Sequence, residues 1–168
     1  MVKAISGCLK IGKSIMKIKT LLLTSLLGLT ACSTMSAPNH VSTIERNKAN
    51  VLAFYDLAFA QHKPQEAVDK YIGNEYLQHN PRVADGGQAF VNLITSFLKK
   101  FPQSQPHIKR VIAEGDLVVL HVNSKKTPDE LGNAVVDIFR LDSNGKIVEH
   151  WDVSMPVPEK TVSGRGVF

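Results

Sequence analysis

Cysteine is nearly absent from this chain, which contains Cys8 and Cys32 and no others. So few thiols leave no disulfide framework and no thiolate metal cluster in the body of the chain. The sequence also lacks a glycine-rich phosphate loop, a nucleophile elbow and the basic aromatic surface that binds nucleic acid. These absences argue against nucleotide, serine-hydrolase and nucleic-acid functions, and we expect no cofactor.

The sequence gives only weak support for a metal site. Side chains able to ligate a metal are present, but their spacing resembles no ligand motif; they are His79, His121, His150 and Asp152. We therefore expect no metal.

No apolar run reaches the ~20 residues that a membrane-spanning helix needs. The run from Leu21 to Leu29 follows a basic segment and precedes Ala31-Cys32, which is the order of a secretory signal peptide. Residues 29–32, LTAC, resemble the lipobox of bacterial lipoproteins. The resemblance implies cleavage before Cys32, acylation of Cys32 and, with Ser33 following, an outer-membrane anchor facing the periplasm. An ordinary signal peptide is the alternative, and Met16 is the expected start.

Basic residues outnumber acidic ones, 20 to 15, but the excess lies in front of Cys32. Five lysines and no acidic residue occupy residues 1–31, so the remaining 137 residues carry 15 of each sign. The pI near 9.3 therefore belongs to the signal peptide and does not indicate a polyanionic partner. We divide the chain into a signal peptide (1–31), a tether (32–43) and one domain (44–168).

The stretch from Ala134 to Met155 predicts a β-hairpin. Two runs rich in β-branched and aromatic residues flank Asn144-Gly145, the strongest short-range hairpin signal. A two-residue type I′ turn there would place Asp137 opposite Asp152, and a four-residue loop would keep the same faces. A three-residue loop would separate the two carboxylates.

One face of this hairpin would gather Asp137, Asp152 and His150 among apolar side chains. Two carboxylates and an imidazole on an apolar face are costly unless they are paired or functional. We therefore predict a catalytic site of Asp137, Asp152 and His150. Desolvation and the neighbouring carboxylate would raise the pKa of Asp137, so that it serves as acid and base in turn.

The rest of the chain predicts helices followed by strands. Helical periodicity covers Ile44 to Ala60, Pro64 to Gly73 and Gly87 to Phe101. Residues 75–85 read as a short extended segment and loop, and strands are expected at 107–113 and 117–125 before the hairpin. The fold class is therefore α+β, with three N-terminal helices packed on a curved antiparallel sheet.

Four segments carry a family resemblance: residues 76–81 (YLQHNP), 113–116 (AEGD), 137–140 (DIFR) and 149–153 (EHWDV). Together they resemble the SnoaL-like proteins of the nuclear transport factor 2-like superfamily, in particular the predicted aldol-condensation subgroup. The likeness spans about residues 47–168. It implies a cone-shaped fold that opens onto an apolar pocket, and it implies dimerisation through the sheet.

The resemblance also implies roles for individual residues. Asp137 and Tyr55 look like the two proton donors of ketosteroid isomerases, but Asn80 stands where those enzymes have a general base, and an amide cannot accept a proton at neutral pH. Asp137 resembles the acid/base of polyketide cyclases. We predict that the substrate-binding residues are Tyr55, His79, Asn80 and His121.

Two functions remain open. The first is a lipid-anchored enzyme that performs cofactor-free acid/base chemistry, of aldol-condensation or cyclisation type, on a small apolar carbonyl compound. The second is a noncatalytic protein of the same fold that binds a small ligand or a protein partner. Fold alone does not decide between them.

Overall fold

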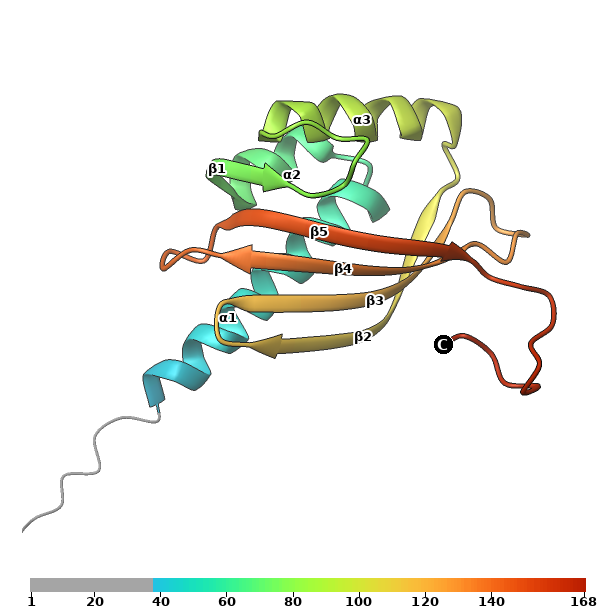
Figure 1. The fold of residues 1–168 in the computed structure, drawn as a ribbon. Helices are drawn as coiled ribbons and strands as arrows, with labels where there is room; N and C mark the ends of the chain where they lie inside the picture. The colour runs from blue at the N-terminus through green and yellow to red at the C-terminus, as the bar shows by residue number, and fades with distance from the viewer. Residues whose placement is uncertain (1–37) are drawn as a thin grey trace, which may run out of the picture. The chain divides into compact units, whose positions relative to one another are not determined.

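The computed structural model describes residues 38–168 and, within them, the side chains from Ser42 onward. The elements follow one another as α1 (Pro38–Tyr55), η1 (Asp56–Ala60), α2 (Pro64–Tyr71), β1 (Ile72–Gln78), α3 (Gly87–Lys100), β2 (Gln105–Glu114), β3 (Leu117–Lys125), β4 (Asn133–Leu141) and β5 (Ile147–Pro156). Helices cover one face of a sheet whose other face carries none of these helices (Figure 1). The predicted α+β class is confirmed. The predicted signal peptide, with Cys32, lies outside the described residues.

The five strands form one mixed sheet in the order β1-β5-β4-β3-β2. Strands β2 to β5 are the predicted antiparallel meander. Of the segment predicted at 75–85 as an extended stretch and loop, residues 75–78 belong to strand β1, which starts at Ile72 and pairs with β5 in parallel. Hydrophobic periodicity indicates that a segment is a strand but not which other strand it pairs with, so the pairing of β1 with β5 was not predicted.

Helix α1 differs from the prediction at both ends. It begins at Pro38, inside the segment expected to be a tether, so Ser42 lies within the helix and does not cap it. Its expected last turn, Asp56–Ala60, is instead a π-helix, in which the amide of Gln61 donates to the carbonyl of Asp56 at 2.8 Å. Helices α2 and α3 match their predictions to within two residues.

The core lies between the helices and the inner face of the sheet. Phe54 from α1 is fully buried, and its ring centroid lies 5.3 Å from that of Phe90 in α3 and 6.0 Å from that of Phe139 in β4. Leu120 and Ile147 are also fully buried. Burying one such side chain stabilises a fold by ~1.5–3 kcal/mol, so this contact between helices and sheet holds the domain together.

The β4–β5 hairpin has the predicted register but a different turn. Asp137 pairs with Asp152, and Phe139 pairs with His150. The loop has three residues, Ser143 to Gly145, because Asp142 N–H donates to the carbonyl of Lys146 at 2.8 Å. Gly145 has φ +79°, whereas Asn144 does not have the positive φ that a type I′ turn requires.

A three-residue loop was expected to separate the carboxylates, and a β-bulge explains why it does not. Leu141 pairs with Ile147, while the next pair is Arg140 with Glu149, so Val148 is an extra residue in β5. One extra residue shifts side-chain alternation by one position. The bulge therefore offsets the odd loop, and both carboxylates point to the same face.

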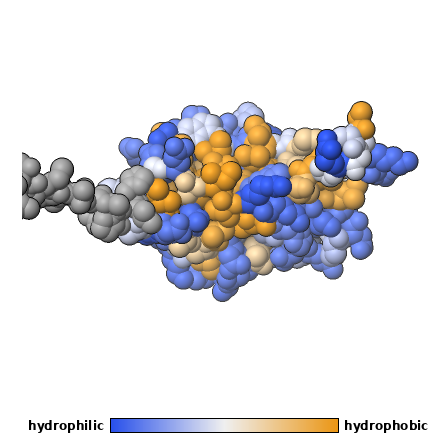
Figure 2. Space-filling model, turned by 90° about the horizontal axis from the view of Figure 1, so that it is seen from below, coloured by the Kyte–Doolittle hydropathy of each residue, from blue (hydrophilic) through white to orange (hydrophobic). Residues whose placement is uncertain are grey.

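Strand β2 is an edge of the sheet, and its surroundings are partly apolar. Figure 2 views the molecule from the β2 side of Figure 1 and shows hydrophobic side chains gathered across the middle of this face. Ile112 of β2 is 61% exposed. The same strand has a register irregularity between Ile108 and Arg110, and it carries Lys109 and Arg110 there. A bulge and basic side chains oppose pairing with a further strand.

The turn also anchors the hairpin to α1, which gives a stability prediction. Asn50 Nδ2 donates to the carbonyl of Gly145 at 2.8 Å, and a Cβ on Gly145 would meet Arg46 Nε and Asn50 Nδ2 at 2.8 Å. We expect Gly145→Ala to lower the free energy of unfolding by about 2–3 kcal/mol, from left-handed backbone strain plus the disturbed contact.

Gly115→Ala is the matched control, because Gly115 has φ +59° and open space around its Cβ position. It should lose only about 1–2 kcal/mol, the strain alone. Urea unfolding of both variants measures the difference, and equal losses would show that the contact with α1 contributes nothing.

Candidate active site

A cavity of about 550 Å³ lies between the helices and the inner face of the sheet. Six phenylalanines line it: Phe54, Phe59, Phe90, Phe97, Phe101 and Phe139. Polar side chains enter this apolar lining from β1, β4 and β5. They include Gln78, Asp137, His150 and Asp152.

Asp137 is the buried acidic group of this cavity, 6% exposed. The Tyr55 hydroxyl donates to its Oδ2 at 2.9 Å, and His150 Nε2 lies 3.1 Å from its Oδ1. Tyr55 comes from the end of α1, immediately before the π-helix, and π-helical turns occur frequently at functional sites. The predicted residues Asp137, His150 and Tyr55 therefore meet in one hydrogen-bonded group.

Asp152 lies beside Asp137 and is held by a second predicted residue. Opposed residues of an antiparallel pair have Cβ atoms about 4.5–5.5 Å apart, and these two are opposed. Asn80 Nδ2 donates to both carboxylate oxygens of Asp152 at 2.9 Å. Arg82 N–H donates to Asn80 Oδ1 at 2.9 Å, which fixes the orientation of that amide.

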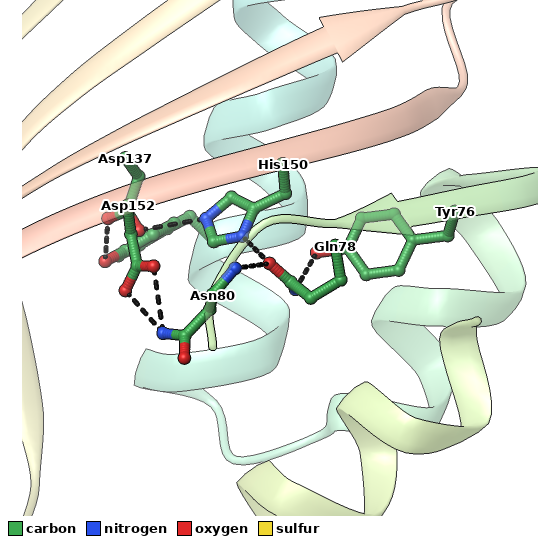
Figure 3. A network of polar contacts seen from close by, with 7 residues as sticks. Tyr76, Gln78, Asn80, Asp137, His150 and Asp152 are labelled. Atoms are coloured by element: carbon green, nitrogen blue, oxygen red, sulfur yellow. Dashed lines mark hydrogen bonds and ion pairs between the residues drawn. The ribbon is translucent and has the colours of Figure 1, made fainter. Parts of the chain in front are cut away.

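Gln78 joins the two groups and was missed in the sequence. Its Oε1 lies 2.8 Å from His150 Nδ1 and 3.1 Å from the amide nitrogen of Asn80, while its Nε2 donates to the Tyr76 hydroxyl at 3.3 Å. Figure 3 shows this chain of contacts running from Tyr76 through Gln78 to His150, and through Asn80 to Asp152. Gln78 and Tyr76 are two residues apart on β1, which was the available signal that they share a face.

Two predicted binding residues lie elsewhere. His79 does not line the cavity; its ring stacks on Trp151 at 4.7 Å and its Nε2 lies 2.9 Å from Glu149 Oε1. This hydrogen bond, followed by that from Arg140, lowers the pKa of Glu149. His79 therefore belongs to a surface cluster on the outer side of the sheet.

His121 is also on the outer face. Its neighbours in β3, Leu120 and Val122, are fully buried, so strand alternation turns His121 away from the cavity. Its Nδ1 lies 2.9 Å from an Arg110 guanidinium nitrogen, and its ring packs on Phe168 at 5.2 Å. Neither histidine is placed to touch a ligand in the cavity.

Burial changes the acidity of two tyrosines in the site. Burial, followed by the nearby Asp137 charge, raises the pKa of Tyr55 well above its usual 10.0. Burial also raises the pKa of Tyr76. Both hydroxyls therefore keep their protons at neutral pH and are available as hydrogen-bond donors.

Within residues 38–168, no three His, Cys, Asp or Glu side chains converge as metal ligands. No helix there is long and apolar enough to cross a membrane.

Residues 51–150 match the SnoaL-like domain family, which is more than half of the chain, and the protein belongs to that family. Among solved structures, a SnoaL-like protein of unknown function from Burkholderia thailandensis is 14% identical, with a TM-score of 0.54 over 66% of this chain and 95% of that one. A proposed polyketide cyclase from Bacillus cereus is 19% identical, with a TM-score of 0.57 over 65% of this chain and 74% of that one.

A proposed ketosteroid isomerase from Kribbella flavida is 16% identical, with a TM-score of 0.55 over 70% of this chain and 84% of that one. At such identities these neighbours establish the fold alone. No curated protein matches the sequence. The nuclear transport factor 2-like fold predicted from the sequence is confirmed.

The raised pKa values of Tyr55 and Tyr76 predict how stability depends on pH. Above pH 10 the unfolded chain releases phenolic protons that the native protein retains, so the free energy of unfolding falls as pH rises. Each tyrosine contributes up to about 1.4 kcal/mol per pH unit. Urea unfolding between pH 9 and 11 measures the slope, and Tyr55→Phe should make it shallower. An unchanged slope in that variant would contradict burial of a neutral Tyr55.

Proposed function

We propose that the cavity binds a small, largely apolar carbonyl compound and that Asp137 transfers a proton on it, without a cofactor, in an aldol-condensation or cyclisation type of reaction. The observation that supports this most strongly is the placement of Asp137. It is a buried carboxyl group at the wall of an aromatic cavity, held by Tyr55 and His150. Such groups are uncommon without a function.

The shape and lining of the cavity support the ligand class. A volume of about 550 Å³ is within the range of small-molecule sites, which is roughly 300–1,000 Å³. Its phenylalanines favour an apolar body, while the connected polar network of Figure 3 places Asp137 and Asp152 together on its wall. A ligand oriented by its carbonyl would bring the neighbouring carbon to this polar end.

The proposed step begins with Asp137 as a carboxylate. It removes a proton from the carbon beside the carbonyl, the electron pair moves onto the carbonyl oxygen, and an enolate forms. The enolate carbon then attacks a second carbonyl carbon of the same ligand, and the new alkoxide takes the proton back from Asp137. His150 and Tyr55 hold the carboxyl group in place throughout.

A second base is not available at Asn80. Its amide nitrogen is committed to Asp152 and its oxygen accepts from Arg82 N–H. An amide also cannot take up a proton at neutral pH. Asn80 therefore positions the Asp152 carboxylate and does not act as a base. For this reason the proposal does not extend to isomerisation of the ketosteroid type.

Noncatalytic ligand binding is the alternative, and one observation favours it. Both oxygens of Asp137 already have partners within the described protein, as a purely structural network would require. Under this alternative the cavity still binds an apolar ligand, but Asp137 only stabilises the fold.

The test is proton exchange. Ligands that co-purify with the protein are identified by mass spectrometry, and exchange of their α-hydrogens, or those of a panel of cyclic and aryl ketones, is followed by NMR in D₂O. We expect Asp137→Asn to slow protein-dependent exchange by about 10²–10⁴-fold, the usual contribution of a general acid or base.

Asp116→Asn is the control, because Asp116 pairs with Arg140 on the protein surface. It should exchange like the wild type. Full exchange activity in Asp137→Asn would exclude Asp137 as the group that transfers the proton, and bound ligand without protein-dependent exchange in the wild type would leave only the binding function.

We also propose that the protein is anchored to the outer membrane through an acylated Cys32, facing the periplasm. The order of basic, apolar and small residues before Cys32 supports this. Two acyl chains on the cysteine supply the level of hydrophobicity that stable anchoring needs.

Labelling with radioactive palmitate tests the anchor. Wild-type protein should incorporate the label and fractionate with membranes, whereas Cys32→Ser should do neither. Cys8→Ser is the control and should behave like the wild type. Equal labelling of Cys32→Ser and the wild type would place the lipid on another residue, and a wild type without label would exclude the anchor.

A further inference from the structure

We propose that Gln78 is a positioning residue that sets the direction of every hydrogen bond around His150, so that one proton is held between His150 and Asp137. The catalytic use of that proton rests on the proposed function. The hydrogen-bond directions do not, because they follow from contacts between groups of the protein itself.

The first step is the orientation of the Gln78 amide. The backbone N–H of Asn80 can only donate, and it lies 3.1 Å from Gln78 Oε1. Rotating the amide by 180° would bring two donors together there. Gln78 Oε1 is therefore the acceptor on this side, and its Nε2 points to the Tyr76 hydroxyl, 3.3 Å away.

The second step is the state of the imidazole. His150 Nδ1 lies 2.8 Å from Gln78 Oε1, an oxygen that has no proton to give, so Nδ1 must carry the hydrogen. A neutral imidazole with the proton on Nε2 would set two lone pairs against each other at this contact. The partner of one ring nitrogen thus decides the tautomer of the ring.

The third step concerns the opposite side of the ring. His150 Nε2 and Asp137 Oδ1 are 3.1 Å apart, and two lone pairs at that distance would repel. One proton between them removes the repulsion, either on His150 as an imidazolium or on Asp137 as a carboxylic acid. Transfer of this proton between His150 and Asp137 requires no rearrangement of the contact between Gln78 and His150 Nδ1.

The other titratable groups around His150 are compatible with this arrangement. Tyr55 on α1 donates to the second Asp137 oxygen, and Asp152 lies next to Asp137 on β5, held by an amide. Tyr76 on β1 stacks over the His150 ring, with centroids 6.5 Å apart. Burial raises the pKa of Tyr76, so it adds no charge beside the ring.

Gln78 also acts on Tyr76. The Tyr76 oxygen accepts from Gln78 Nε2, and among the described residues its own proton has no hydrogen-bond acceptor. Tyr76 lines the cavity, so this proton is available to an oxygen of a bound ligand. The Gln78 side-chain amide therefore orients both the His150–Asp137 pair, which shares a proton, and the Tyr76 hydroxyl, which can donate one.

The test is the ¹⁵N NMR spectrum of the histidines in the full protein, with the His150 signals assigned by their loss in His150→Gln. We expect Nδ1 of His150 to carry a proton from acidic to alkaline pH for as long as the protein stays folded. A spectrum with Nδ1 unprotonated at neutral pH would overturn the proposal, and this needs no variant at Gln78.

Two variants then test the cause. Gln78→Leu removes the acceptor, and a signal from the Nε2–H tautomer should appear. Tyr76→Phe is the matched control: it removes the contact to Gln78 Nε2 but keeps Oε1 in place, so Nδ1 should stay protonated. An unchanged tautomer in a folded Gln78→Leu would show that Gln78 is not responsible.

Gln78→Glu separates this proposal from the proposed function. A carboxylate still accepts from Asn80 N–H and His150 Nδ1–H, so the tautomer should match the wild type. Because the added charge favours the imidazolium, the pH dependence of α-hydrogen exchange should shift. If α-hydrogen exchange is absent in the wild type and in every variant but the His150 tautomer follows these expectations, the positioning role of Gln78 is supported and the proposed enzymatic function is excluded.

Discussion

The opposition of β4 and β5 is the constraint on which the rest of the site depends. It places Asp137 beside Asp152 and Phe139 beside His150 on the face that the helices cover. The carboxyl group is thereby forced into an aromatic cavity, where it is stable only because Tyr55 and His150 satisfy its two oxygens. A shift of one residue in β4 would turn Asp137 to the outer face, and a shift in β5 would turn His150 and Asp152 there. The bulge at Val148 is therefore as important for the site as the residues in it.

Polar contacts in the cavity form one connected group and not a set of separate pairs. Two backbone N–H groups of the loop after β1, those of Asn80 and Arg82, orient the side-chain amides of Gln78 and Asn80. These amides in turn hold His150 and Asp152. Because backbone donors cannot reverse their role, the direction of the whole group is determined by the course of a short loop. This is the physical basis for treating β1 and its loop as part of the site.

Sequence patterns were sufficient for the elements that depend on local periodicity. Helices α2 and α3, the antiparallel meander and the opposition of Asp137 and Asp152 were all predicted. The register was right although the turn was wrong, since the odd loop and the bulge cancel. Failures came from longer-range arrangement: His79 and His121 face the outer side of the sheet, and Gln78 was not recognised. The pairing of β1 is irregular before His79, so period two did not place that residue, whereas the regular alternation of β3 around His121 was a signal that the prediction did not use.

By itself, the sequence determined the fold class, the hairpin, and the placement of Asp137, His150 and Asp152 on one face, because each follows from the period of the side chains. Only the tertiary structure decided that β1 lies parallel to β5, with Gln78 paired to His150. Parallel pairing joins residues 72 positions apart, and no periodicity within either segment encodes its partner. The contact that orients the imidazole therefore exists only once helix α2 has brought β1 back to the edge of the sheet.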